Sequence, residues 1–231
     1  MIKNKRFTGA AFAAALAVGI AVPLHGAQAV TITNGSFENG VANIGAFETL
    51  NAVDSTSIAG WTVSNGSVDY IGTYWTAAGG SRSLDMNGLS AGTISQLING
   101  LTPGQQYRVT FDLAGNTDAG PTNKTLDVTA GIGNNSYSFS IIGHDRNNMG
   151  WVMESFVFTA DGISDLLSFS STVFSGGTPE NPAAFGPALD NVAISATPLP
   201  STWLMLLSGF VGLGFFAYRG TKKSTAALAA V

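Results

Sequence analysis

The chain has 231 residues, of which 10% are charged against roughly 25% in an average soluble protein, and its formal net charge is −4. All 14 acidic residues lie between residues 30 and 200, where the only basic residues are Arg82, Arg108, Lys124 and Arg146. This balance argues against nucleic acid as a partner. The absence of cysteine excludes a disulfide framework, a thiol nucleophile and a thiolate zinc site.

Residues 1–29 have the features of a secretory signal peptide. A basic start precedes an apolar stretch over residues 10–22, and the segment ends in Ala-Gln-Ala. This order is typical of a signal peptide that is cleaved, so we expect export and a mature protein that begins near Val30. A membrane helix that stays in place is the alternative, and the short, alanine-rich stretch with its cleavage-type ending disfavours it.

Residues 30–197 have the pattern of one all-β domain. In YRVTFDLAG, residues 107–115, apolar and polar residues alternate with the period of two expected of a half-buried strand. The preceding TPGQ, residues 102–105, suits a turn with Pro second and Gly third. Many short strands with turn-rich spacers favour a β-sandwich or barrel. Further strands are predicted at residues 30–38, 60–72, 83–88, 92–100, 124–133, 137–142, 151–160, 166–174 and 188–195.

The last predicted strand contains an irregularity. Its apolar residues fall at Leu189, Val192 and Ile194, so one step is three residues where alternation requires two. An extra residue at Asp190-Asn191 would form a β-bulge, which re-aims side chains near sites. We therefore expect Asp190 to turn toward a pocket.

Residues 198–223 combine a hydrophobic run with a basic end, and residues 224–231 form a short tail. The uncharged run from Trp203 to Tyr218 would form a helix of roughly 24 Å, and its flanks bring it close to the roughly 30 Å of a bilayer's hydrocarbon core. Basic residues that follow at once favour the cytoplasmic side; they are Arg219, Lys222 and Lys223. We therefore expect a transmembrane helix. A buried core helix is the alternative, which the glycines of the run disfavour.

The tripeptide Pro198-Leu199-Pro200, the apolar run and the basic cluster together resemble the C-terminal sorting signal called PEP-CTERM, found in Gram-negative bacteria that make exopolysaccharide. In that family a membrane transpeptidase-like exosortase recognises the signal and is associated with its cleavage. The resemblance implies an exosortase-type partner and a location at the cell surface or in the extracellular matrix. Leu199 stands where the usual signal has Glu.

Seven motifs in order resemble the choice-of-anchor C family of bacterial surface proteins. They are NGSFE at 34–38, GW at 60–61, VDYIG at 68–72, GSRSLDMNG at 80–88, TPGQQYRVTFDLAGN at 102–116, MGW at 149–151 and GPALDNVAI at 186–194. That family is similar to a plant cell-wall group with galactose-binding-like folds, so the resemblance implies a jelly-roll β-sandwich for residues 30–197. It implies fold and surface location rather than an activity.

The same resemblance implies a structural calcium ion. In similar jelly-roll carbohydrate-binding modules, Ca²⁺ lies between the NGxFE segment and an Asp at the start of the last strand. Carried over to this chain, the ligands are Glu38 and Asp190, with main-chain oxygens completing a shell of six to eight. The alternative is that Asn34-Gly35 forms a turn and Glu38 is a solvated surface charge.

The segment VDYIGTYWTAAGGSRS, residues 68–83, gathers side chains suited to glycan binding. Aromatic faces stack on sugar rings, while charged groups bind sugar hydroxyls. Tyr74 and Trp75 are expected to be the best exposed, whereas Tyr70, Trp61 and Trp151 are alternatively core residues. The glycan-binding candidates are Asp69, Tyr70, Tyr74, Trp75 and Arg82.

Two functions of different classes follow. The first is an exported, non-catalytic surface or matrix protein that binds or packs among extracellular polysaccharide. The second is a secreted carbohydrate-active enzyme, either an esterase or a glycoside hydrolase. His144 is the only histidine beyond residue 29 and no G-x-S-x-G elbow is present, which weakens a serine triad. Pairs among the 14 acids leave glycoside hydrolysis open.

Overall fold

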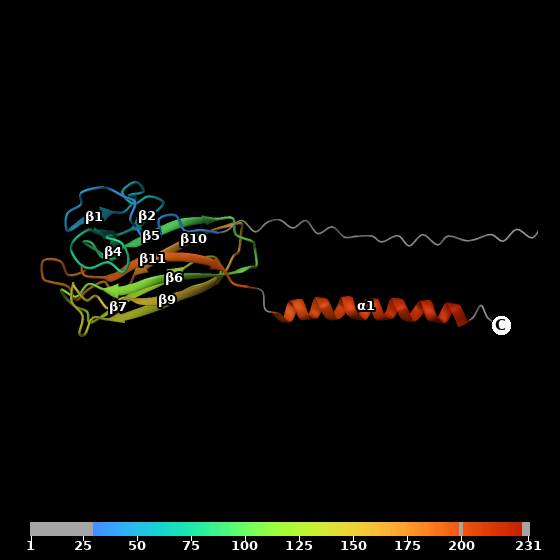
Figure 1. Cartoon of the computed structure of the whole chain (residues 1–231). Helices are drawn as coiled ribbons and strands as arrows, with labels where there is room; N and C mark the ends of the chain where they lie inside the picture. The colour runs from blue at the N-terminus through green and yellow to red at the C-terminus, as the bar shows by residue number, and fades with distance from the viewer. Residues whose placement is uncertain (1–29, 199–200, 228–231) are drawn as a thin grey trace, which may run out of the picture.

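The computed structural model describes residues 30–198 and 201–227. The expected signal peptide at residues 1–29, the sorting residues Leu199 and Pro200, and residues 228–231 of the tail lie outside these ranges. The described chain forms two antiparallel sheets followed by one helix, α1 (Figure 1). The predicted all-β sandwich is confirmed.

The first sheet has six strands and the second has five. In spatial order the first contains β1 (Phe47–Asn51), β3 (Ser67–Ile71), β4 (Ser83–Asp85), β11 (Pro187–Ala196), β6 (Gln106–Gly115) and β9 (Val152–Thr159). The second contains β2 (Thr62–Asn65), β5 (Thr93–Asn99), β10 (Ser164–Ser171), β7 (Asn123–Thr129) and β8 (Asn134–Ser140). Consecutive strands often lie in different sheets, so contacts distant in sequence hold the fold together.

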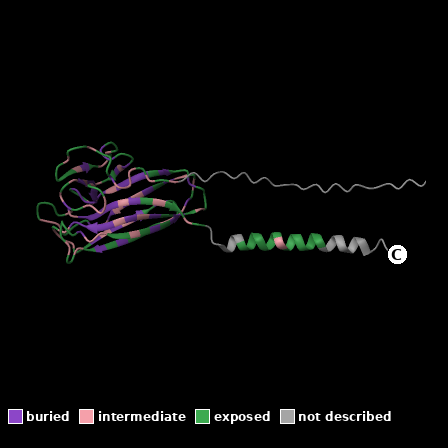
Figure 2. Cartoon of the chain, viewed as in Figure 1, coloured by how far each residue is buried: buried purple, intermediate pink, exposed green. Residues whose placement is uncertain are grey.

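The hydrophobic core lies between the two sheets, where buried residues line the facing sides (Figure 2). The predicted alternation of β6 is confirmed, because Val109, Phe111 and their alternate neighbours are buried while Arg108 is exposed. Phe111 of β6 packs edge-on against Phe169 of β10 with 5.2 Å between ring centroids, which connects the two sheets. Trp61, next to β2, lies 6.2 Å from Phe169 by ring centroids. Trp61 is 2% exposed, which confirms it as a core residue.

The sequence-based strands differ from the structure in three places. Residues 30–38 form turns rather than a strand, and Asn34 and Phe37 have positive φ angles, which an extended strand does not allow. The strand predicted at residues 60–72 is divided at Gly66, so that β2 and β3 belong to different sheets. Gly66 has φ +61°, and a Cβ there would lie 2.0 Å from Ala91 O, so only glycine fits. Strand β1 was not predicted.

The predicted bulge in β11 is confirmed. The register of β11 against β6 shifts between Asp190 and Ala193, and Asn191 adopts φ 51°. Asp190 lies opposite Asp112 and is fully buried, whereas Val192 joins the core. Strand β11 also runs from the loop at Phe185 to the exit of the chain toward α1, a length of about 30 Å.

Helix α1 spans Ser201–Ala227, and its side chains from Met205 to Arg219 are almost all exposed (Figure 2). The expected transmembrane helix is corrected: within residues 30–198 and 201–227, no helix is both long and apolar enough to cross a membrane. The uncharged run contains one serine and three glycines, which add little hydrophobicity. Of the sorting residues, Pro198 is exposed, Arg219 lies over the Phe215 ring at 5.4 Å, and Lys222 and Lys223 belong to α1.

Candidate functional site

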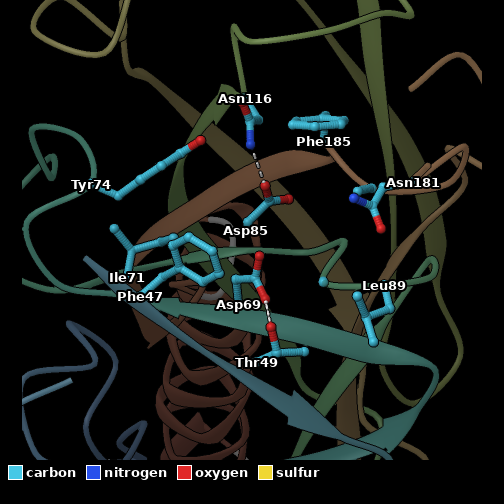
Figure 3. Close-up of a pocket in the computed structure, with 12 residues that line it drawn as sticks. Phe47, Thr49, Asp69, Ile71, Tyr74, Asp85, Leu89, Asn116, Asn181 and Phe185 are labelled. Atoms are coloured by element: carbon cyan, nitrogen blue, oxygen red, sulfur yellow. Dashed lines mark hydrogen bonds between the residues drawn. The ribbon is translucent and has the colours of Figure 1, made fainter. Parts of the chain in front are cut away.

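A pocket of about 210 Å³ opens on the face of the six-stranded sheet that points away from the five-stranded sheet (Figure 3). Tyr70 and Leu84 enter the core, so the alternate residues Asp69 and Asp85 point to the opposite face. Three strands and four loops supply the lining. Its residues are Phe47, Thr49, Asp69, Ile71, Tyr74, Asp85, Gly88, Leu89, Asn116, Asn181, Ala184 and Phe185.

Asp69 and Asp85 form the acidic part of the lining and lie directly opposite each other on β3 and β4 (Figure 3). Asp85 is 1% exposed and accepts hydrogen bonds from Asn87 N at 2.9 Å, Gly186 N at 2.9 Å and Asn116 Nδ2 at 2.7 Å. Burial nevertheless raises its pKa to about 7. Asp85 thus holds three pocket loops to strand β4.

Asp69 is the more accessible of the two carboxylates. Burial raises its pKa, and the Thr49 hydroxyl donates a hydrogen bond to its Oδ1 (Figure 3). Among the described residues, Asp69 Oδ2 and the side-chain oxygen and nitrogen of Asn181 take part in no hydrogen bond. These polar atoms are therefore free to bind a ligand.

Aromatic and aliphatic side chains form the rest of the rim. Phe47 is 42% exposed and packs edge-on against Tyr74, with ring centroids 5.2 Å apart, and Leu89 is exposed as well. Phe185 has φ 71°, a left-handed conformation that is rare for a bulky side chain and that clusters at functional sites. The pocket thus places flat apolar surfaces beside free polar atoms.

Tyr74 is fixed at the rim by Arg146 and Asp118. Arg146 Nη2 donates to the Tyr74 hydroxyl at 2.7 Å, and the guanidinium lies 4.0 Å from the ring centroid. The same guanidinium pairs with Asp118 Oδ2 at 2.7 Å, and the Tyr74 hydroxyl donates to that oxygen too. Burial and the hydrogen bond to Asp118 raise the pKa of Tyr74 to about 12, so the phenol stays protonated. The ring is thereby held in one orientation.

Lys124 supports the pocket from behind. Its side chain is fully buried, and Nζ donates to Ala119 O at 2.7 Å, Gly120 O at 3.0 Å and Phe185 O at 2.6 Å. Burial lowers its pKa to about 8. The ammonium connects the loop after β6 to the loop before β11, and it holds the strained backbone of Phe185 in place.

The predicted glycan residues do not all reach the pocket. Tyr74 and Asp69 line it. Tyr70 is fully buried and donates to Phe37 O, and Arg82 lies over the Tyr70 ring at 5.3 Å beside a separate shallow hollow. Trp75 is 5% exposed and donates to Ser83 Oγ at 2.8 Å, so the expectation of an exposed Trp75 is wrong. The loop folds back over the sheet, where strand alternation does not apply.

Most lining residues do not stand out in the sequence as site residues. Phe47 belongs to the unpredicted strand β1, and Asp85 lies within a segment that predicts a strand and carries a family resemblance but does not indicate a site. One sequence signal could have indicated more of them: several lining residues come shortly after or before a strand that belongs to the six-stranded sheet. The other lining residues that were not among the predicted site residues are Thr49, Ile71, Gly88, Leu89, Asn116, Asn181, Ala184 and Phe185.

The predicted calcium ligands lie on either side of one loop, residues 79–82. Glu38 Oε1 accepts hydrogen bonds from Ser81 N and Arg82 N, both at 2.8 Å, while Asp190 Oδ2 accepts one from Gly79 N at 3.1 Å. Burial raises the pKa of Asp190 to about 7. Within the described residues no three acidic or histidine side chains gather as a metal site. Main-chain oxygens would have to complete a calcium shell here.

Comparison with known proteins gives likenesses of fold and of sequence. The chain is similar to the CBM22-1 xylan-binding domain of Paenibacillus barcinonensis Xyn10C. The match covers 69% of this chain and 100% of that chain, with 18% sequence identity and a TM-score of 0.40. It is also similar to CBM35 from Cellvibrio japonicus Abf62. That match covers 74% of this chain and 95% of that chain, with 13% sequence identity and a TM-score of 0.42. Structural likenesses of this extent do not identify a ligand.

The sequence comparisons are closer. Halomucin of Haloquadratum walsbyi is 33% identical over 171 residues, which is 71% of this chain and 2% of that protein, so the chain spans a very small part of the relative. Residues 30–195 match the family described as "Protein of unknown function (DUF642)", and this match covers the sandwich except for the last residue of β11. The chain therefore belongs to the DUF642 family.

Proposed function

We propose that this DUF642 domain is a non-catalytic polysaccharide-binding module of an exported protein and that the pocket around Asp69 is its sugar site. The observation that carries the proposal is the pairing of an exposed ring, Phe47, and a half-buried ring, Phe185, with free polar atoms in one pocket. Phe47 and Phe185 offer apolar faces to a sugar ring, while Asp69 Oδ2 and the Asn181 amide are free to bind hydroxyl groups. Strand β11 places the pocket at the opposite end of the sandwich from the exit toward α1, where an external polymer can reach it.

The first prediction concerns Phe47. Replacing it by alanine should weaken binding at least about tenfold, or about 1.4 kcal/mol, because a sugar would lose the exposed ring on which it packs. The measurement is retention of the full chain on xylan, cellulose, chitin and β-galactan, followed by calorimetry with the polymer retained. Phe174→Ala is the matched control, since Phe174 is 70% exposed and does not line the pocket. Equal retention of both variants would contradict the proposed site.

A secreted glycoside hydrolase is the second candidate, and the Asp69–Asp85 pair favours it. Asp69 and Asp85 share one pocket, and most glycoside hydrolases use a pair of carboxyl groups as their catalytic residues. Asp85, however, is occupied by three N–H donors and serves to anchor loops. Release of reducing ends from the polysaccharide that is retained, abolished in Asp69→Asn, would favour the enzyme over the binding module.

Export and C-terminal sorting belong to the same proposal and rest on the sequence patterns of residues 1–29 and 198–223. The resemblances to the choice-of-anchor C family and to PEP-CTERM signals support a surface or matrix protein processed by an exosortase-type enzyme. The intact mass of cell-associated and released protein should correspond to a species that begins near Val30 and ends close to Thr202. A mature species that retains Trp203–Val231 would contradict processing.

Calcium binding at Glu38 and Asp190 is proposed as a stabilising contact of the loop at residues 79–82. A cation there would compensate the buried carboxylate of Asp190. Calcium at a hundredfold excess over Kd should stabilise the folded protein by about 2.7 kcal/mol, so chelation should lower Tm. Thermal unfolding with calcium and with chelator is the measurement, and Asp190→Asn should remove the difference. Identical melting curves for the wild-type protein would rule the ion out.

A further inference from the structure

The pocket lining carries two acidic side chains and no basic one. From this charge pattern we infer that the preferred ligand is a sugar unit that bears a protonated amine, with neutral sugars second and uronic acids rejected. The inference rests on the proposed function, because it names the ligand class of the same pocket. It is based on two observations: the pocket lining contains no basic residue, and one oxygen of the Asp69 carboxylate has no hydrogen-bond partner among the described residues.

The nearby cations are directed away from the pocket. The ammonium of Lys124 makes hydrogen bonds to three backbone carbonyls, and the guanidinium of Arg146 is bound to Asp118 and to the Tyr74 hydroxyl. Neither Lys124 nor Arg146 belongs to the lining. Within the pocket lining, no cationic side chain therefore neutralises the carboxylates of Asp69 and Asp85.

Asp69 is the carboxylate that is left to bind a ligand. Asp69 and Asp85 are direct cross-strand partners. Asp85 already uses both carboxylate oxygens, whereas Asp69 Oδ2 has no hydrogen-bond partner among the described residues. An ammonium group placed at Asp69 Oδ2 would form a charge-assisted hydrogen bond. A carboxylate in the same place would lie against the carboxylate of Asp69 and be repelled.

The size of the cavity limits the ligand to one sugar unit. Its volume of about 210 Å³ lies below the roughly 300–1,000 Å³ of pockets for drug-sized ligands. Phe47, Leu89 and Phe185 supply apolar lining on different sides of the cavity, and Asp69 lies between Phe47 and Leu89 (Figure 3). A pyranose can lay an apolar face on Phe47 and direct an amino substituent to the Asp69 carboxylate.

The experiment is a matched ligand series measured by calorimetry with the full chain at pH 6, where a sugar amine is protonated. The probes are the methyl β-glycosides of glucose and of galactose, each as the neutral sugar, the 2-amino-2-deoxy sugar, its N-acetyl form and the uronic acid. We expect at least about tenfold tighter binding of the amino sugar than of the neutral sugar in one configuration. The N-acetyl form should lose this gain, because acetylation removes the charge, and the uronic acid should bind most weakly.

Variants and salt separate charge recognition from pocket shape. Asp69→Asn keeps the oxygen that accepts from Thr49 and should reduce the ratio of amino-sugar to neutral-sugar affinity to about one. Glu48→Gln is the matched control, because Glu48 is exposed on the same sheet and does not line the pocket. The ratio should also fall as salt is raised. Neutral sugars binding as tightly as amino sugars would overturn the inference and leave the proposed function intact. No binding by any of the eight probes would overturn the inference too, and retention on the four polymers then decides the proposed function separately.

Discussion

Replacing Lys124 by methionine should lower the free energy of unfolding by about 3 to 5 kcal/mol. Methionine fills much of the same space, so the main loss is that of the ammonium, which serves three carbonyl oxygens at 2.6 to 3.0 Å. Each buried polar group left without a partner costs about 1 to 3 kcal/mol, and partial rearrangement of the loops reduces the sum. Urea unfolding of the full chain measures the change.

The control for this variant is Arg108→Met. Arg108 is an exposed cation on β6 whose guanidinium makes one long hydrogen bond, at 3.4 Å to Ser155, so its replacement should change stability by less than about 0.5 kcal/mol. Because Lys124 also holds Phe185 O, the Lys124 variant should lose glycan binding under conditions where it is still folded. Equal stability of the two variants would show that the three carbonyls find other donors.

The strands that could be predicted are those whose pattern is local. Strand β6 alternates from Gln106 to Leu113 and follows a recognisable turn, where Gln105 N donates to Thr102 O at 3.0 Å and Gly104 has φ 78°. The bulge at Asp190 was visible for the same reason, because one extra residue shifts the apolar period. Residues 30–38 have a strand-like composition, yet the positive φ angles of Asn34 and Phe37 depend on packing that their own sequence does not reveal.

The candidate site could be predicted only in part. Tyr74 and Asp69 were selected because polar and aromatic residues gather in one short segment, and both line the pocket. Trp75, selected for the same reason, is buried against Ser83, because the loop that carries both aromatics lies on the sheet. Residues such as Asn116 and Phe185 meet Asp85 only because β11 lies between β4 and β6. That neighbourhood is a property of the topology, and no local pattern encodes it.

With calcium removed by a chelator, the stability of the domain should fall as the pH rises from about 4 to 7. Asp85 and Asp190 have ordinary pKa values near 3.8 in the unfolded chain, and burial raises both to about 7 in the folded protein. In this window the folded state keeps protons that the unfolded state has released, so raising the pH favours unfolding. A shift of about three pKa units corresponds to up to about 4 kcal/mol for each fully buried carboxyl group.

Other ionisable groups set the limits of this window. Asp165, whose pKa is raised by burial to about 6, acts in the same direction. The pKa values of Asp54 and Asp118 are lowered, so their contribution to stability is lost only as the pH falls below about 4. Burial lowers the pKa of Lys124 from 10.5 to about 8, so stability should rise again from about pH 8 to 10 as the folded state releases this proton first. The free energy of unfolding should therefore pass through a minimum between about pH 7 and 8.

Asp85→Asn is the variant that tests the cause of this profile. Asparagine keeps the oxygen that accepts from Asn87 N and Gly186 N but cannot accept from Asn116 Nδ2, so the variant is expected to be less stable at acidic pH. The informative quantity is the slope of the free energy of unfolding between pH 4 and 7, measured by urea unfolding, which should fall by up to half. Glu48→Gln, which removes an exposed carboxylate, should leave the slope unchanged. A slope that is the same in wild type and Asp85→Asn would mean that Asp85 is ionised in the folded protein throughout this range, and that its three N–H donors are sufficient to stabilise the charge.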